Sequence, residues 1–357
     1  MTEHSIDLAL QGGGSHGAFT WGVLDRLLED PDLRIGGLSG TSAGAMNAVV
    51  LASGYGSGGR QGARQALSVF WEAIGRAGSR SPWGQTPLDA LFEPWLPNGS
   101  PMLKFFDVMS RLISPYQLNP WNINPLRNLV EKHVDFDVIR SLEEPKLFVN
   151  ATNVSTGHNR IFRNADINLD AVLASACLPV LFHAVEIENE AYWDGGYVAN
   201  PALLPLIAES EPHDLILIQI NPVERPGIPR TAHDIIDRIN EISFNSSLNQ
   251  ELRSVALIKR LLKEEEVSGH SYKAPLFARI DSLFLHRIEA QKEMRPLGAS
   301  SKLSSNWSLI SRLHDIGYQT ADTWLTENRQ SLGQRSTIEL LDDYTGCPDD
   351  GFGGPAA

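Results

Sequence analysis

Two glycine-framed loops within the first 45 residues constrain this chain more than any other feature. The first loop is Gly12–Gly17 (GGGSHG), and the second is Gly40–Gly44 (GTSAG). Each loop follows a short apolar run typical of a buried strand and precedes an apolar run typical of a helix. The sequence therefore predicts two strand–turn–helix corners near each other, and with them an α/β fold built on a mostly parallel sheet.

The second loop matches the pattern G-x-S-x-G, in which a serine lies on a sharp turn between a strand and a helix. Residues Leu33–Ser39 (LRIGGLS) supply the strand, and Ala43–Ala52 (AGAMNAVVLA) supply a helix rich in small residues. Because small neighbours leave the hydroxyl group exposed, Ser42 is a candidate nucleophile. The bare pattern is also typical of an ordinary tight turn, so its interpretation depends on the rest of the chain.

The first loop literally matches the dinucleotide-binding pattern G-x-G-x-x-G through Gly12, Gly14 and Gly17. A nucleotide site would also need an acidic residue about 20 residues later, at the end of the second strand. Asp30 and Asp32 come before that strand, and no P-loop lysine follows the glycines. The better interpretation is a loop of unhindered backbone N–H groups that stabilise developing negative charge.

A serine nucleophile needs a base, and the chain offers two kinds. His183, His286 and His314 are the histidines at suitable late positions, although none lies in a distinctive loop. Asp194 lies in Trp193–Tyr197 (WDGGY), after a stretch that resembles a hairpin. Taken without context, Asp-Gly-Gly is typical of a hairpin turn.

Taken in order, these blocks resemble the patatin-like phospholipases, a family of serine–aspartate lipid acyl hydrolases. The resemblance rests on the glycine loop, the Gly-Thr-Ser-Ala-Gly turn and the Asp-Gly-Gly turn. It rests also on the predicted helix Leu169–Pro179 (LDAVLASACLP) and the predicted strand Leu147–Asn153 (LFVNATN). The resemblance covers residues 6–222 and implies a three-layer α/β/α domain with a mostly parallel central sheet.

The resemblance also implies roles for individual residues. Ser42 would be the nucleophile, and Asp194 the general base that takes its proton directly. Backbone N–H groups would form the oxyanion hole, and the candidate donors are Gly12, Gly13, Gly14 and Ser15. The family usually has arginine or lysine where this chain has His16, which leaves open whether a fixed positive charge acts there. No cofactor and no metal ion are expected.

A segment rich in proline and aromatic residues, 79–133, separates the helix after the elbow from the central sheet. We expect short helices and loops there, forming a lid or an acyl-chain channel; the alternative is a subdomain that completes the core. The candidate substrate-binding residues in this segment are Trp95, Phe105, Phe106 and Met109. The glycine-rich stretch Ser53–Arg64 (SGYGSGGRQGAR) is predicted to be a mobile loop.

The predicted catalytic domain spans residues 5–225, and residues 226–357 are predicted to form a mainly helical C-terminal extension with a frayed tail. Helical periodicity runs through Ala232–Glu266 and Asn306–Arg329, whereas Leu276–Leu285 (LFARIDSLFL) alternates like a strand. An apolar helical stripe usually packs on its own domain. A homodimer face formed by these helices is the alternative.

Charge and cysteine content limit the function classes. The net charge of −13 argues against nucleic-acid partners and against strong attraction to anionic membranes, so contact with a membrane or lipid granule would depend on apolar surface. The two cysteines, Cys177 and Cys347, offer no disulfide framework. The N-terminus lacks a signal-peptide pattern, and no run approaches the about 20 apolar residues of a membrane helix. These features predict a cytoplasmic protein.

The function predicted from the sequence is hydrolysis of a carboxylic ester in a lipid or another hydrophobic acyl substrate, through an acyl-enzyme. Such an enzyme would be of the phospholipase A, lysophospholipase or esterase type. Two alternatives stay open. One is acyl transfer to an alcohol or amine by the same residues, and the other is a catalytically idle protein associated with lipid or polyester granules.

Overall fold

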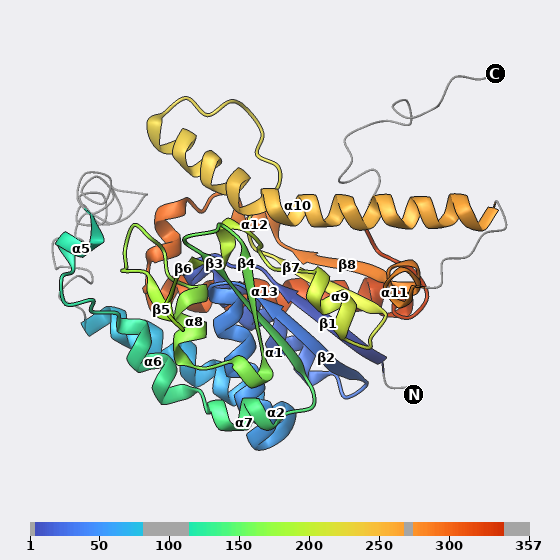
Figure 1. Ribbon diagram of the computed structural model, residues 1–357, viewed down its shortest axis with the longest axis horizontal. Coiled ribbons are helices and arrows are strands. Elements are labelled where there is room, and N and C mark those ends of the chain that lie inside the picture. Colours follow the sequence, from blue (N-terminus) through green and yellow to red (C-terminus); the bar gives the residue numbers. More distant parts are fainter. Residues whose placement is uncertain (1–3, 81–113, 268–273, 339–357) are drawn as a thin grey trace.

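The computed structural model describes residues 4–80, 114–267 and 274–338 (Figure 1). In this part of the chain an eight-stranded sheet lies between two layers of helices. The strands are β1 (His4–Leu10), β2 (Leu33–Gly40), β3 (Lys146–Asn153), β4 (Asn159–Arg163), β5 (Val185–Ile187), β6 (Glu190–Asp194), β7 (Asp214–Gln219) and β8 (Phe284–Glu289). The candidate substrate-binding residues Trp95, Phe105, Phe106 and Met109 lie outside the described residues.

The order of the sheet is β5-β6-β3-β2-β1-β7-β8, with β4 also paired with β3. The pairs among β1, β2, β3, β7 and β8 are parallel, whereas β4, β5 and β6 add antiparallel pairs. At the carboxyl end of the central strands, Leu10 is paired with Gly40. Because parallel strands end at the same edge, the two glycine-framed loops that follow them lie side by side.

Helices cover both faces of the sheet. One layer consists of α1 (Gly17–Glu29), α2 (Ala43–Arg80) and α13 (Trp307–Asn328), and the other of α9 (Leu204–Glu209), α10 (Ala232–Val267) and α11 (Pro275–Ser282). The shorter helices are α5 (Pro115–Leu118), α6 (Pro125–His133), α7 (Phe136–Ser141), α8 (Leu169–Ser175) and α12 (Gln291–Met294). This arrangement confirms the predicted three-layer α/β/α fold with a mostly parallel sheet and a helical C-terminal part.

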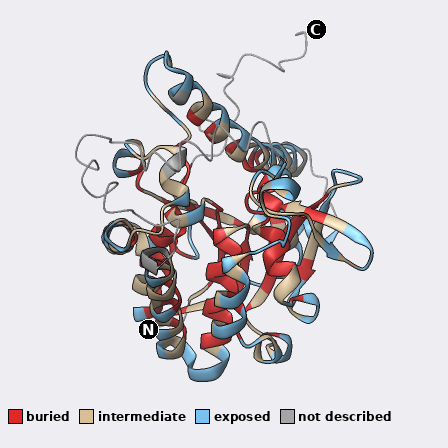
Figure 2. Ribbon diagram, turned by 90° about the vertical axis from the view of Figure 1, so that its left-hand side faces the viewer, coloured by how far each residue is buried: buried red, intermediate tan, exposed pale blue. Residues whose placement is uncertain are grey.

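The alternation of side chains along the strands produces two apolar cores. On β1, Ile6, Leu8 and Leu10 face the α1 side, whereas Ala9 faces the α10 side. In Figure 2, buried residues lie along the strands and on the inner sides of the helices. The central strands are therefore buried on both faces, as expected for a parallel sheet between helices.

The C-terminal residues contribute directly to this body. Strand β8 pairs in parallel with β7, and α13 packs along α1. The residues predicted as an extension thus supply an edge strand of the central sheet and a helix that covers it. Within the described ranges, no helix combines the length and the apolar character needed to cross a membrane.

The prediction of a mobile loop at Ser53–Arg64 is wrong, because these residues belong to α2. The helix is interrupted only at Gly58 and Gly59, where the backbone is not helical. An added Cβ on Gly54 would lie 2.6 Å from the carbonyl oxygen of Gly62. The glycines here therefore allow the two halves of α2 to pack closely around the interruption, rather than marking a loop.

The prediction of a strand at Leu276–Leu285 is also wrong for most of its length. Residues Pro275–Ser282 form α11, and β8 begins only at Phe284. Proline is well suited to the first turn of a helix, and the spacing of Leu276 and Ile280 fits one helical turn. Over so few residues, an alternating pattern does not separate a helix from a strand.

Candidate active site

Ser42 lies at the sharp turn between β2 and α2. Its φ of 54° is in the left-handed region, which residues with a side chain seldom adopt. The flanking glycines make this turn possible: a Cβ on Gly44 would lie 2.1 Å from the Leu10 carbonyl oxygen, and one on Gly40 would lie 2.5 Å from the Gly44 oxygen. Ser42 itself is partly exposed while its neighbours are buried. This is the geometry expected of a nucleophile elbow.

Asp194 ends β6 and is fully buried. Its backbone N–H donates to the Cys177 carbonyl oxygen (2.8 Å), and its carbonyl oxygen accepts from Thr152 Oγ1 (2.8 Å). In the side chain, Oδ1 accepts a hydrogen bond from the Gly196 N–H (2.7 Å). A Cβ on Gly196 would lie 2.5 Å from the Phe244 ring, so this position requires a glycine.

The hairpin turn lies elsewhere. Strands β5 and β6 are joined through Glu188 and Asn189, which both have positive φ. Asp194 instead caps a short 3₁₀ helix, η4 (Gly195–Tyr197). The Asp-Gly-Gly block therefore positions a buried carboxylate and does not form the hairpin turn that its composition also allowed.

The environment of Asp194 favours its neutral form. Burial raises the pKa of Asp194 to about 7, and the Gly196 N–H and the Ser42 side chain oppose this rise. The second carboxylate oxygen, Oδ2, is buried and has no hydrogen-bond partner among the described residues, so it is free to accept a proton. A carboxylate with a pKa near neutrality is well matched to the work of a general base.

Two polar residues that sequence reasoning did not single out hold the elbow against the Asp194 turn. Asn150 of β3 accepts a hydrogen bond from Thr41 Oγ1 and donates through Nδ2 to the Gly195 carbonyl oxygen (3.2 Å). Ser175 Oγ accepts the N–H of Ser42 (3.0 Å). Both are fully buried, so a polar residue inside an apolar run was the available signal.

The glycine loop lies directly against the nucleophile. A Cβ on Gly12 would lie 2.9 Å from the Ser42 Cβ. The Gly12 N–H already donates to Asn200 Oδ1 (2.7 Å). None of the hydrogen bonds between described residues is donated by the N–H groups of Gly13, Gly14 or Ser15, of which Gly14 and Ser15 open the 3₁₀ helix η1 (Gly14–His16). Of the four candidate donors, Gly13, Gly14 and Ser15 are therefore those whose N–H groups have no partner in the described part of the chain.

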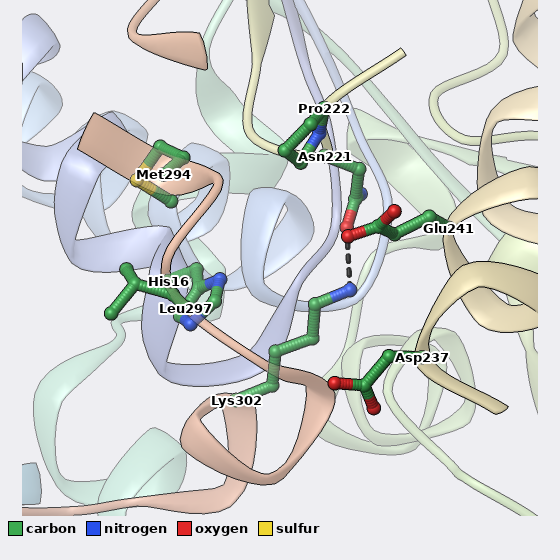
Figure 3. Close-up of a pocket in the computed structure, with 8 residues that line it drawn as sticks. All are labelled: His16, Asn221, Pro222, Asp237, Glu241, Met294, Leu297 and Lys302. Atoms are coloured by element: carbon green, nitrogen blue, oxygen red, sulfur yellow. Dashed lines mark hydrogen bonds between the residues drawn. The ribbon is translucent and has the colours of Figure 1, made fainter. Parts of the chain in front are cut away.

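His16 is buried beneath this loop and contacts Ser301 (Nε2 to Oγ, 2.7 Å). Burial and the neighbouring Lys302 lower the pKa of His16 to about 3, so its ring is neutral at physiological pH. The nearby cation is Lys302, in the 3₁₀ helix η5 (Ala299–Leu303), whose Nζ donates to Asn221 Oδ1 (2.5 Å; Figure 3). Neither Lys302 nor Asn221 was identified from the sequence.

The three late histidines are placed by other contacts. The His183 ring stacks on Tyr116 at 4.0 Å between centroids, and His286 Nε2 bonds to Asp214 Oδ1 (2.9 Å). His314 lies against Trp21, 4.0 Å between ring centroids. Of the described histidines, none forms a hydrogen bond with Ser42 or Asp194.

No three His, Cys, Asp or Glu side chains in the described ranges are grouped to hold a metal ion.

One comparison with known proteins agrees with this geometry. The family model described as patatin-like phospholipase matches residues 8–207, more than half of the chain. The curated proteins contain no match. Among solved structures, VipD from Legionella pneumophila is similar over 96% of this chain and 73% of VipD, with 13% sequence identity. The TM-score of 0.40 is too low to support an inference. Since the matched residues include both glycine-framed loops and the Asp-Gly-Gly turn, the chain belongs to the patatin-like phospholipase family, whose domain supports lipid acyl hydrolysis.

Proposed function

We propose that this protein hydrolyses carboxylic esters in lipids or other hydrophobic acyl substrates, with Ser42 as nucleophile and Asp194 as general base. The observation that carries the proposal is the pairing of a partly exposed serine on a strained turn with a buried carboxylate. Asp194 Oδ2 has no hydrogen-bond partner of good geometry among the described residues, and Ser42 is the side chain that favours the charged form of Asp194. The two groups therefore have the chemistry of a catalytic dyad.

In the proposed reaction, Ser42 Oγ attacks the ester carbonyl carbon and Asp194 takes the hydroxyl proton. The negative charge that forms on the carbonyl oxygen is stabilised by the N–H groups of Gly13 and Gly14. Collapse of this intermediate breaks the ester C–O bond, and Asp194 returns the proton to the departing alcohol. Water then attacks the acyl-enzyme and Asp194 takes its proton; breakage of the ester bond to Ser42 releases the free acid, and Asp194 returns the proton to Ser42 Oγ.

The lipid substrate, a cytoplasmic location and contact with a membrane or lipid granule belong to the same proposal. The family match supports a lipid substrate. Apolar residues on one side of α10, Ile235, Ile239 and Ile242, are exposed and offer apolar surface for such contact, or for the homodimer predicted through the C-terminal helices. With a net charge of −13, binding to a lipid surface would depend on apolar rather than ionic contacts.

The test is a panel of p-nitrophenyl esters and phospholipids, run with the wild-type protein and with Ser42→Ala. We expect hydrolysis and labelling by a fluorophosphonate probe in the wild type, and loss of both in Ser42→Ala. Ser57→Ala is a matched control, because Ser57 is exposed on α2, away from the elbow, and should leave both signals unchanged. Full turnover by folded Ser42→Ala protein would exclude the proposed mechanism.

A further inference from the structure

We propose that Lys302 is a positioning residue for the oxyanion hole, acting through Asn221 on the peptide that joins Gly12 to Gly13. The inference rests on the proposed function, since it assigns a role in that same reaction. Lys302 lies outside the residues matched by the family model and comes from the opposite end of the chain. Its connection to the loop consists of two hydrogen bonds in series.

The first bond joins Lys302 Nζ to Asn221 Oδ1 (2.5 Å), and the second joins Asn221 Nδ2 to the Gly12 carbonyl oxygen (3.0 Å). A lysine ammonium can only donate, so it holds the amide oxygen of Asn221 toward itself. The amide N–H₂ group is thereby directed at Gly12. Without the ammonium, nothing in this pair would prevent the amide from turning its oxygen toward the Gly12 carbonyl.

The Gly12 carbonyl and the Gly13 N–H belong to one planar peptide group. A hydrogen bond accepted by the carbonyl oxygen polarises that group and makes its N–H a stronger donor. The bond from Asn221 is itself strengthened by the charge on Lys302. The positive charge therefore acts on the Gly13 N–H, the group assigned to the developing oxyanion, although the ammonium does not touch the substrate.

The backbone of η5 supports the same loop. A Cβ on Gly14 would lie 2.2 Å from the Lys302 carbonyl oxygen, which shows how closely the two segments pack. One residue earlier, Ser301 Oγ contacts His16 Nε2 (2.7 Å). These contacts fix the position of Lys302 relative to the loop, so its side chain approaches Asn221 from a defined point (Figure 3).

The titratable and charged groups around Lys302 belong to α10, to the segment before α10 and to η1. Glu241 and Asp237 of α10 favour the charged ammonium, whereas Arg225, before α10, disfavours it. His16, from η1, is neutral, and the Phe244 ring lies 5.6 Å from Nζ. Burial has the largest effect and lowers the pKa of Lys302 to about 8. Lys302 thus carries its charge at neutral pH and loses it as the pH rises through about 8.

The experiment compares Lys302→Met, Lys302→Arg and the control Lys259→Met in the full chain. Lys259 is a matched control: burial also lowers its pKa to about 8, but its Nζ donates to the carbonyl oxygens of Ile280, Asp281 and Leu283, between α10 and α11. Its removal should lower the melting temperature without changing the activity of the folded protein. Kinetics with a p-nitrophenyl ester are measured from pH 6 to 10.

We expect Lys302→Met to lower kcat by about tenfold or more, because a weakened oxyanion donor costs transition-state binding, while KM changes little. Wild-type activity should fall above about pH 8, because Lys302 loses its charge there, and this fall should be absent in Lys302→Met. Lys302→Arg should restore most of the activity and extend it to higher pH, since arginine does not titrate there. Asn221→Ala should reproduce the loss, and the double variant Lys302→Met/Asn221→Ala should add little to it.

Two results would overturn the inference while leaving the proposed function intact. One is a Lys302→Met protein whose kcat, and whose loss of activity above about pH 8, are the same as in the wild type. The other is an equal loss of kcat in Lys302→Met and Lys259→Met, which would indicate a structural role. A wild-type protein that shows no Ser42-dependent hydrolysis and no fluorophosphonate labelling would instead refute both proposals together. The Ser42→Ala measurement run in parallel separates these cases.

Discussion

The two glycine-framed corners lie side by side but are held in different ways. The turn around Ser42 is shaped by neighbours in sequence, and the distant residues Asn150 and Ser175 then hold it in place. The Gly44 N–H donates to the Thr41 carbonyl oxygen (2.8 Å), and the Met46 N–H donates to the Ser42 oxygen (3.0 Å). Its glycines also pack on each other, so a few consecutive residues define the turn.

The loop Gly12–Gly17 depends instead on residues distant in sequence. Asn200, Asn221 and Ser301 contact it across sequence separations of 188, 209 and 285 positions. The difference teaches that the shape of the turn carrying the proposed nucleophile is specified largely by its own residues, whereas the proposed oxyanion donors are positioned by the completed fold. Substitutions at the two corners should therefore fail in different ways.

The largest expected effect concerns the dyad itself. Asp194→Asn preserves size and removes basicity, so kcat should fall by about 10²–10⁴-fold, the usual contribution of a general base. Adding Ser42→Ala should lower activity little further, because the two residues act as one unit. His286→Ala and His314→Ala should retain most activity per folded molecule. A histidine variant that folds normally yet is as inactive as Ser42→Ala would replace the dyad with a triad.

The next effect separates the two proposed glycine donors of the loop, Gly13 and Gly14. Gly14→Ala should cost more than Gly13→Ala, because Gly14 has a φ of 57° and its Cβ would collide with Lys302, whereas Gly13 is extended and meets Ile220 at 3.2 Å. Loss of one oxyanion donor costs about 2.7–4 kcal/mol of transition-state stabilisation. Measured kcat values and melting temperatures check this order.

Gly58→Ala is the control for these glycine variants. A Cβ at Gly58 would have no described atom within 4 Å, and the residue lies in the interruption of α2. This substitution should leave kcat unchanged. If Gly13→Ala lowers kcat more than Gly14→Ala, the contact with Lys302 does not govern the loop.

A smaller effect is expected from pH. Asp194 must be ionised to accept the serine proton, and burial raises its pKa to about 7. The value of kcat/KM should therefore increase about tenfold per pH unit on the acid side and level off between about pH 7 and the decline above about pH 8 that loss of the Lys302 charge should cause. A pH profile with a short-chain ester checks the midpoint. A midpoint near pH 4 would mean that the working carboxylate is exposed to water.

The smallest effect is expected at His16. Its ring is neutral and directed at Ser301, so His16→Ala should lower kcat by less than about tenfold, well below the cost of a lost oxyanion donor. Ser301→Ala breaks the same contact from the other side and should give a similar change. A loss at His16 greater than that at Gly13 would assign the oxyanion to the imidazole rather than to the backbone.

Sequence reasoning succeeded where the physical constraint is local. A local constraint leaves a sequence pattern within a few positions. Examples are the small residues around Ser42, the glycines after Asp194 and the apolar runs of strand length. It failed at Ser53–Arg64, where glycines serve close packing inside a helix, and at Leu276–Leu285, where a short pattern fitted two structures. In both cases contacts made elsewhere in the chain decided which structure formed.

The sequence by itself determined the two corners, the family, and the candidate pair Ser42 and Asp194, because backbone strain and steric limits act between neighbours. Only the tertiary structure showed that Asn221 and Lys302 reach the glycine loop. It also showed that β8 belongs to the central sheet. Hydrogen bonds and strand pairs between segments far apart in the sequence leave no local pattern, because their geometry exists only when those segments have packed together.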